Sequence, residues 1–205
     1  MLEKALPAAG MAGWLDSMEP VLRHSSGISL HVLRAHEAGT LFTLINRNRQ
    51  HLREWLPWVD ASRDVWDTRR FLERSYGSYL RGGGFSFGIQ RNRELVGVIG
   101  FHGFDTVNRV TSLGYWLAEE ACGQGLMRAG VDACVSYAFG ERGMNRLYVR
   151  CATGNLRSRK VAEALGFVHE GTQREAEWLY DHFADLEVYS VLAREWRERS
   201  SGDSL

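Results

Sequence analysis

The chain has 205 residues with ordinary apolar and charged fractions, enough for one domain with a full hydrophobic core. Lysine plus arginine equals aspartate plus glutamate, 25 against 25, so no net basic field favours a nucleic-acid partner. No apolar run reaches the length of a membrane span and residues 1–13 lack the order of a secretory signal, so we expect a cytoplasmic protein without membrane contact.

The first third of the chain predicts one strand followed by helices. Residues 1–24 are expected to form a weakly ordered N-terminal extension. Ile28–Leu33 alternates as a first strand, and Glu37–Val59 has the spacing of one or two helices that end at Pro57. Asp64–Arg81 is a further helix, stopped by three consecutive glycines.

The middle of the chain predicts a hairpin and a strand that leads into a helix. Phe85–Arg91 and Leu95–Phe104 are two strands joined by a turn at Asn92. Val110–Ala118 is the next strand, and Gly125–Phe139 is a helix with one apolar face.

The junction between that strand and that helix predicts an anion site. The first N–H groups of a helix lack intrahelical acceptors, and the helix dipole makes this end partly positive. Gly123 and Gly125 carry no Cβ to hold a phosphate away, and Gln124 adds an amide that can reach outward. The loop suits a diphosphate, although any tight strand-to-helix turn also uses two glycines.

The last third of the chain predicts a strand, a helix and two further strands. Arg146–Phe167 is interpreted as strand, loop and helix, with Leu147, Val149 and Cys151 on one face of its strand. A strand then runs from about Phe167 to about Arg174, Asp185–Leu192 is the last strand, and residues 200–205 form a polar tail. This order of elements gives a mixed α/β sheet.

Two motifs resemble the GNAT superfamily of acyl-CoA-dependent N-acyltransferases, and in detail its ribosomal-protein-serine (RimL-like) branch. The first is the loop Cys122-Gly-Gln-Gly-Leu-Met127, in which Cys122 departs from the usual Arg or Gln. The second is Asn155-x-x-Ser158 with Gly166-Phe167 closing the helix. Leu52-x-x-Trp55-Leu-Pro-Trp58 also fits the branch, and the resemblance runs from about Ile28 to about Trp196.

The resemblance implies a mostly antiparallel, mixed sheet of about seven strands, splayed at an acyl-CoA cleft, with helices on both faces. A single catalytic domain would span residues 25–199. The implied activity is direct acetyl transfer from acetyl-CoA to a primary amine, such as the α-amine of a ribosomal protein, by an enzyme that can form a homodimer. The alternatives are a small-molecule or aminoacyl acceptor, and an acyl-CoA sensor without turnover.

The resemblance also implies which residues hold acetyl-CoA. The pyrophosphate would lie on the amides of the loop from Gly123 through Gln124, Gly125 and Leu126 to Met127. The backbone of Trp116 and Leu117 would meet the thioester and pantetheine, and Asn155 either caps its helix or contacts the pantetheine. Cys151 is either a small buried side chain close to the CoA sulfur or the nucleophile of an acyl-cysteine mechanism.

The catalytic roles fall to two residues. The tyrosine that many superfamily members use as the acid is replaced by Ala162, so Ser158 is the expected acid, although it is also an ordinary first-turn helix residue. Glu177 matches the glutamate that the RimL-like branch offers as the base. Strand alternation would point Glu177 the same way as Glu175, and the alternative is that Glu177 is a surface carboxylate.

The remaining candidates are aromatic residues, histidines and cysteines. Trp55 and Trp58 would wall the acceptor pocket, or else belong to the core. The seven histidines lack metal spacing and are interpreted mostly as surface or structural groups. The three cysteines lack paired spacing, so neither a disulfide framework nor a metal site is expected.

Overall fold

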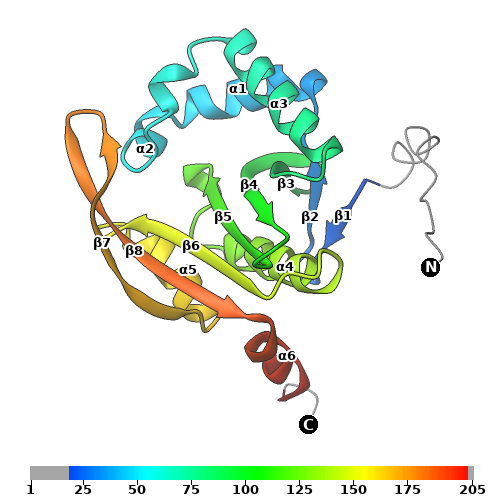
Figure 1. Cartoon of the computed structure of the whole chain (residues 1–205). Helices are drawn as coiled ribbons and strands as arrows, with labels where there is room; N and C mark the ends of the chain where they lie inside the picture. The colour runs from blue at the N-terminus through cyan, green and yellow to red at the C-terminus, as the bar shows by residue number, and fades with distance from the viewer. Residues whose placement is uncertain (1–18, 203–205) are drawn as a thin grey trace, which may run out of the picture.

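The computed structural model describes residues 19–202 and is built around one eight-stranded sheet (Figure 1). The strands are ordered β1-β2-β3-β4-β5-β6-β8-β7, and only β5 and β6 pair in parallel. Their bounds are β1 (Val21–Arg23), β2 (Ile28–Val32), β3 (Phe85–Arg91), β4 (Glu94–Asp105), β5 (Val110–Leu117), β6 (Arg146–Ala152), β7 (Val168–Leu179) and β8 (His182–Leu192). The α-helices are α1 (Ala38–Arg47), α2 (Arg49–Arg53), α3 (Val65–Leu80), α4 (Leu126–Gly140), α5 (Leu156–Ala164) and α6 (Ala193–Gly202).

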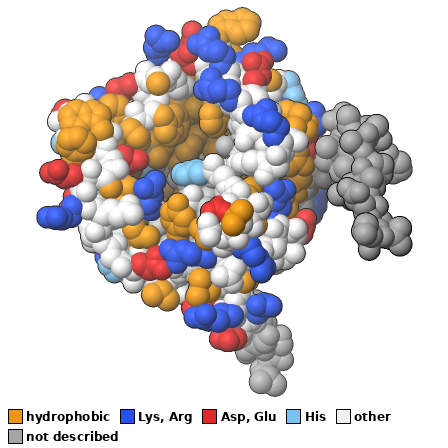
Figure 2. Space-filling model, in the orientation of Figure 1, with side chains coloured by type: hydrophobic (Ala, Val, Ile, Leu, Met, Phe, Trp, Pro, Cys, Tyr) orange, Lys and Arg blue, Asp and Glu red, His pale blue; other side chains and the backbone are white. Residues whose placement is uncertain are grey.

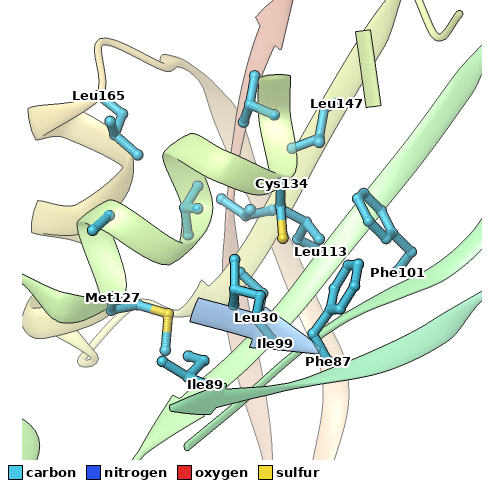
Figure 3. Packing of buried hydrophobic residues seen from close by; sticks show 14 of the residues in the cluster. Leu30, Phe87, Ile89, Ile99, Phe101, Leu113, Met127, Cys134, Leu147 and Leu165 are labelled. Atoms are coloured by element: carbon cyan, nitrogen blue, oxygen red, sulfur yellow. The ribbon is translucent and has the colours of Figure 1, made fainter. Parts of the chain in front are cut away.

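Helices cover both faces of the sheet, as expected. On one face, α4 packs Met127 and Cys134 against strand residues such as Leu30 and Ile99 (Figure 3). On the other face, α1, α2 and α3 enclose a smaller cluster of buried side chains with Val98 of β4. A helix set on each face buries both surfaces of the sheet, which leaves its strand ends as the place for a site.

The chain differs from the sequence prediction at both ends. The structure has eight strands rather than about seven, because β1 lies in the segment expected to be weakly ordered. Three residues are too few to show an alternating pattern, but β1 pairs fully with the edge of β2. The last helix extends to Gly202, into the predicted polar tail. The rest of the predicted extension, residues 1–18, lies outside the described residues.

The local turn chemistry agrees with the sequence. Asn92 and Arg93 both have positive φ, 52° and 68°, as a two-residue hairpin between β3 and β4 requires. The side chain of Asp64 accepts a hydrogen bond from the N–H of Asp67 at 2.8 Å and so begins α3. No helix within residues 19–202 is both long and apolar enough to cross a bilayer.

The sheet opens between β5 and β6. These strands pair only from Val110–Leu113 to Arg146–Val149. Beyond that point β5 continues to Leu117 beside β4 alone, and β6 continues to Ala152 beside β8 alone. Two strands that run parallel and then part leave backbone groups without a partner in the sheet, which is the splay that the family resemblance implied.

Candidate active site

A cavity of about 530 Å³ lies at the splay, between the sheet and α3. The space-filling view shows a hollow whose walls are largely hydrophobic (Figure 2). Seven titratable side chains also line this cavity: Asp67, Arg74, His102, Tyr115, Arg150, Cys151 and Glu177. An apolar cavity with a few convergent polar groups is the usual form of a small-molecule site.

The glycine loop has the geometry of an anion cradle. Gly123 and Gly125 adopt φ of 76° and 75°, a conformation that disfavours other residues, and a Cβ at either position would meet no atom within 4 Å. The N–H of Ala129 donates to the carbonyl of Gly125 at 3.1 Å, so the helix amides before it lie ahead of the first α-helical bond. The side chains of Leu126 and Met127 are buried, which leaves only their backbone for a ligand.

The side chain of Gln124 does not reach outward as expected. Its amide Nε2 donates to the carbonyl of Glu120 at 2.7 Å, and its Oε1 accepts a hydrogen bond from Arg91 of β3. The bond to Arg91 brings a cation to the loop from a residue 33 positions earlier in the chain. Sequence reasoning missed Arg91, because nothing in the local pattern of a hairpin strand indicates a contact with this loop.

The free backbone donors at the splay belong to alternate residues of β5. The N–H of Ala118 donates to the carbonyl of Val96 at 2.9 Å, and N–H groups alternate in direction along a strand. The N–H of Trp116 therefore points toward β4, whereas those of Tyr115 and Leu117 point into the splay. This geometry differs from the expectation for Trp116, whose indole instead lines the cavity.

Ser158 is held at the start of α5 by two sets of contacts. The side chain of Asn155 accepts a hydrogen bond from the N–H of Ser158 at 3.0 Å, so Asn155 caps the helix. The hydroxyl of Ser158 hydrogen-bonds the hydroxyl of Tyr115 at 3.2 Å, and Tyr115 also donates to the carbonyl of Ser158. Burial raises the pKa of Tyr115, so the phenol stays protonated. Sequence reasoning missed Tyr115. Ala162, which stands at the position of the usual acid tyrosine, is buried in the core.

Cys151 has the environment of a neutral thiol. It is 8% exposed, and burial raises its pKa to about 11 although the nearby hydroxyl of Ser158 opposes that rise. A thiolate is the nucleophilic form of cysteine, and it is scarce at neutral pH when the pKa is raised this far. The geometry therefore favours Cys151 as a lining residue of the cavity over a nucleophile.

Glu177 faces the cavity because β7 is bulged. The pairing of β7 with β8 passes from Gln173–Leu186 directly to Glu177–Ala184, so three residues of β7 oppose Asp185 alone. Glu175 lies in the bulge with φ of 49°, and the expected simple alternation of Glu175 and Glu177 is wrong. Burial raises the pKa of Glu177, and the nearby cation of Arg150 opposes that rise.

Three tryptophans form one wall of the cavity. Trp55, Trp58 and Trp116 all line it, and the rings of Trp58 and Trp116 lie 6.2 Å apart. Trp55 also borders a second hollow, of about 420 Å³, between α2 and the β7–β8 hairpin. A site that needs both a thioester and an acceptor has room for the acceptor beside these indoles.

His102 was not singled out by the sequence. It lines the cavity from β4, where burial and the cation of Arg150 lower its pKa. The interpretation of the histidines as mostly surface or structural groups overlooked it, because its place beside Arg150 depends on strand order.

Fold and site together define an acyltransferase of the GNAT class. The model of the Acetyltransferase (GNAT) domain family matches residues 28–168, more than half of the chain, and the protein belongs to this family.

The similar proteins include ribosomal-protein acetyltransferases, one of them named as putative, and a self-immunity acetyltransferase. The putative ribosomal N-acetyltransferase YdaF of Bacillus subtilis is 34% identical over 177 residues, 82% of this chain and 93% of that protein. The structure of RimL, a ribosomal α-N-protein acetyltransferase joined to coenzyme A by a cysteine disulfide, matches with a TM-score of 0.81 at 25% identity. It covers 84% of this chain and 98% of RimL. MccE, a microcin self-immunity acetyltransferase in complex with acetyl-CoA and AMP, matches with a TM-score of 0.77 at 25% identity, over 81% of this chain and 92% of its own.

Proposed function

We propose that this protein transfers the acetyl group of acetyl-CoA directly to a primary amine, in a ternary complex without an acetyl-enzyme. The observation that carries the proposal is the meeting of Ser158, Glu177 and the free end of β5 around one cavity. Transfer from a thioester to an ammonium needs a proton acceptor, donors for the thioester oxygen and a proton donor for the leaving thiolate. The site offers one candidate for each demand.

Acetyl-CoA is the proposed cosubstrate, and the loop fits its pyrophosphate. The amides from Gly123 to Met127 would receive the phosphates, since both glycines leave open space in front of them. The cation of Arg91 beside Gln124 would add charge complementarity. Asn155 and Cys151 would lie along the pantetheine arm. Cys151 lines the cavity without carrying the acyl group, consistent with its neutral thiol.

Each catalytic residue handles one proton or one charge. Glu177 would draw the ammonium into the cavity and accept its proton, directly or through water. The N–H groups of Tyr115 and Leu117 would stabilise the thioester oxygen as it gains negative charge. The hydroxyl of Ser158, held by Tyr115, would protonate the departing thiolate.

The proposed acceptor is the α-amine of a protein or peptide, of the ribosomal-protein type. The names of YdaF and RimL support this acceptor class. A small aminoacyl compound is the second candidate, because an aromatic wall suits a compact acceptor and the similar structure of MccE holds a nucleotide, AMP, beside acetyl-CoA. In both cases Trp55 and Trp58 would contact the acceptor. We extend the proposal to a cytoplasmic homodimer with one catalytic domain at residues 25–199.

A thiol-release assay with mass spectrometry of the products tests the function. The panel contains acetyl-CoA with serine- and alanine-initiated peptides of ribosomal-protein sequence, aminoacyl nucleotides and simple primary amines. Thiol release with acetylation at the peptide α-amine supports the main proposal, and release with aminoacyl compounds alone supports the second candidate. Tight binding of CoA without thiol release from any acceptor would refute both and leave a sensor.

A further inference from the structure

The proposed reaction has a proton problem that Glu177 alone solves poorly. An α-ammonium has a pKa near 8, and a free carboxylate is several units less basic. A carboxylate beside an ammonium also stabilises the charged amine, which hinders its deprotonation. A neutral base close to the carboxylate would divide the two tasks, because the carboxylate could hold the ammonium while the second group accepts its proton.

His102 is placed to be that base. A Cβ at Gly114 of β5 would lie 2.5 Å from Nε2 of His102, so the imidazole packs directly over the backbone of Gly114. Gly114 immediately precedes Tyr115, at the point where β5 leaves β6. The pairing of β4 with β5 shifts between Phe101 and Phe104, and such a bulge re-aims the side chain it carries.

His102 also differs from other histidines because no carboxylate in the described part of the chain pairs with it. Four of them lie within ion-pair distance of a carboxylate: His24 with Asp132, His31 with Glu37, His169 with Glu187 and His182 with Asp181. His102 has no such carboxylate among residues 19–202, it shares the cavity with Arg150, and no group in that range hydrogen-bonds its ring nitrogens. A ring without a partner beside a cation favours the neutral form, which can accept a proton from a substrate.

The other titratable groups around the cavity do not reverse this preference. Asp67 on α3 is held by Arg63 and Arg70, so its charge is already matched outside the cavity. Arg74 of α3 adds a second cation to the cavity lining, and Arg150 of β6 is a cation that opposes a charged imidazole. Tyr115 and Cys151 are kept neutral by burial. Apart from Asp67, Glu177 is the one carboxylate among the described lining residues, and the nearby cation of Arg150 opposes the rise of its pKa.

We infer that His102 is a further catalytic residue of the proposed transfer: His102, rather than Glu177, accepts the proton of the acceptor ammonium, and Glu177 holds that ammonium in place. This inference rests on the proposed acetyl transfer. The amine gives one proton to the imidazole and then attacks the thioester carbon, as the C–S bond breaks. The second amine proton replaces the one that Ser158 gives to the thiolate, and the imidazolium returns its proton to solvent. One acetamide, one thiol and one released proton balance the reaction.

Chemical rescue provides the decisive experiment. His102→Gln should lower kcat for a peptide α-amine about 10²-fold at pH 7, the usual scale for a positioned base, with little change in the KM for acetyl-CoA. The deficit should shrink toward pH 9, where the amine arrives already neutral. Added imidazole should raise the turnover of His102→Ala at least about tenfold, whereas it should leave the turnover of Glu177→Gln unchanged. His36→Gln, at an exposed histidine outside the cavity, is the matched control.

Two results would overturn the inference. One is His102→Gln within twofold of wild type while Glu177→Gln is impaired. The other comes from an NMR titration of wild-type His102, which needs no variant to fold: a ring protonated at pH 7 cannot act as the acceptor. If wild type turns over no amine at all, the proposed function fails instead, so the two failures are distinguishable.

Discussion

Replacing Gly125 separates the backbone role of the loop from its role in binding. Gly125 has φ of 75° and open space in front of it, so an alanine meets no steric clash but must adopt a left-handed conformation. That conformation costs about 1–2 kcal/mol for a residue with a Cβ. For a chain of this size each kcal/mol lowers Tm by about 2–4 °C. We therefore expect Gly125→Ala to remain folded with a modestly reduced Tm.

Gly143→Ala is the matched control. Gly143 follows α4, has φ of 64° and also has no atom within 4 Å of a Cβ, so its substitution should cost about the same stability. Only Gly125 lies where a phosphate is proposed. A methyl group there should displace at least one charged hydrogen bond, worth about 1.5–3 kcal/mol, or about 10- to 150-fold in the Kd for CoA.

Calorimetric titration with CoA, alongside thermal unfolding of both variants, measures the two effects. The expected pattern is an equal loss of Tm in Gly125→Ala and Gly143→Ala with weakened CoA binding in Gly125→Ala alone. Equal CoA affinity in the two variants would refute the assignment of the pyrophosphate to this loop.

Three further predictions concern the cavity. Glu177→Gln should lower turnover about 10²-fold at pH 7. Burial raises the pKa of Glu177 in the folded state, so its charged carboxylate destabilises the fold at a pH above its unfolded pKa. Glu177→Gln should therefore raise Tm at pH 7 and leave Tm unchanged near pH 4. A lower Tm of the variant at pH 7 would contradict this reasoning. Cys151→Ala should keep most of the turnover, and mass spectrometry of the wild type with acetyl-CoA alone should detect no acetyl adduct; a Cys151 adduct that an amine discharges would overturn direct transfer. Ser158→Ala should slow turnover at every pH. Adding Tyr115→Phe to Ser158→Ala should reduce turnover little further, because the phenol of Tyr115 acts by holding the hydroxyl of Ser158. Full additivity of the two effects would show that the two residues act separately.

The elements that the sequence predicted are those with strong local signals. Alternation in β2, the paired positive φ at Asn92 and Arg93, and the apolar stripe of α4 each depend on residues a few positions apart. The glycine loop was also visible, because two glycines between a strand and a helix need no distant partner. Such patterns survive in any compact fold that buries the same faces.

The residues that the sequence could not place depend on strand pairing. Tyr115 and Ser158 are 43 positions apart and meet only because β5 and β6 run in parallel before they separate. Arg91 reaches Gln124 across 33 positions, and His102 and Arg150 line one cavity only after strands β4, β5 and β6 are ordered side by side. None of these contacts leaves a trace in local spacing.

A bulge explains why the sequence mispredicted the relative directions of the Glu175 and Glu177 side chains. A period of two predicts the direction of a side chain only while the register is unbroken, and β7 breaks its register before Glu177. The sequence by itself determined most of the strands and helices and the glycine loop, since those follow from local periodicity and backbone freedom. The tertiary structure alone decided which donors are free at the splay and which side chains share the cavity, because sheet register and strand separation are set by packing between distant segments.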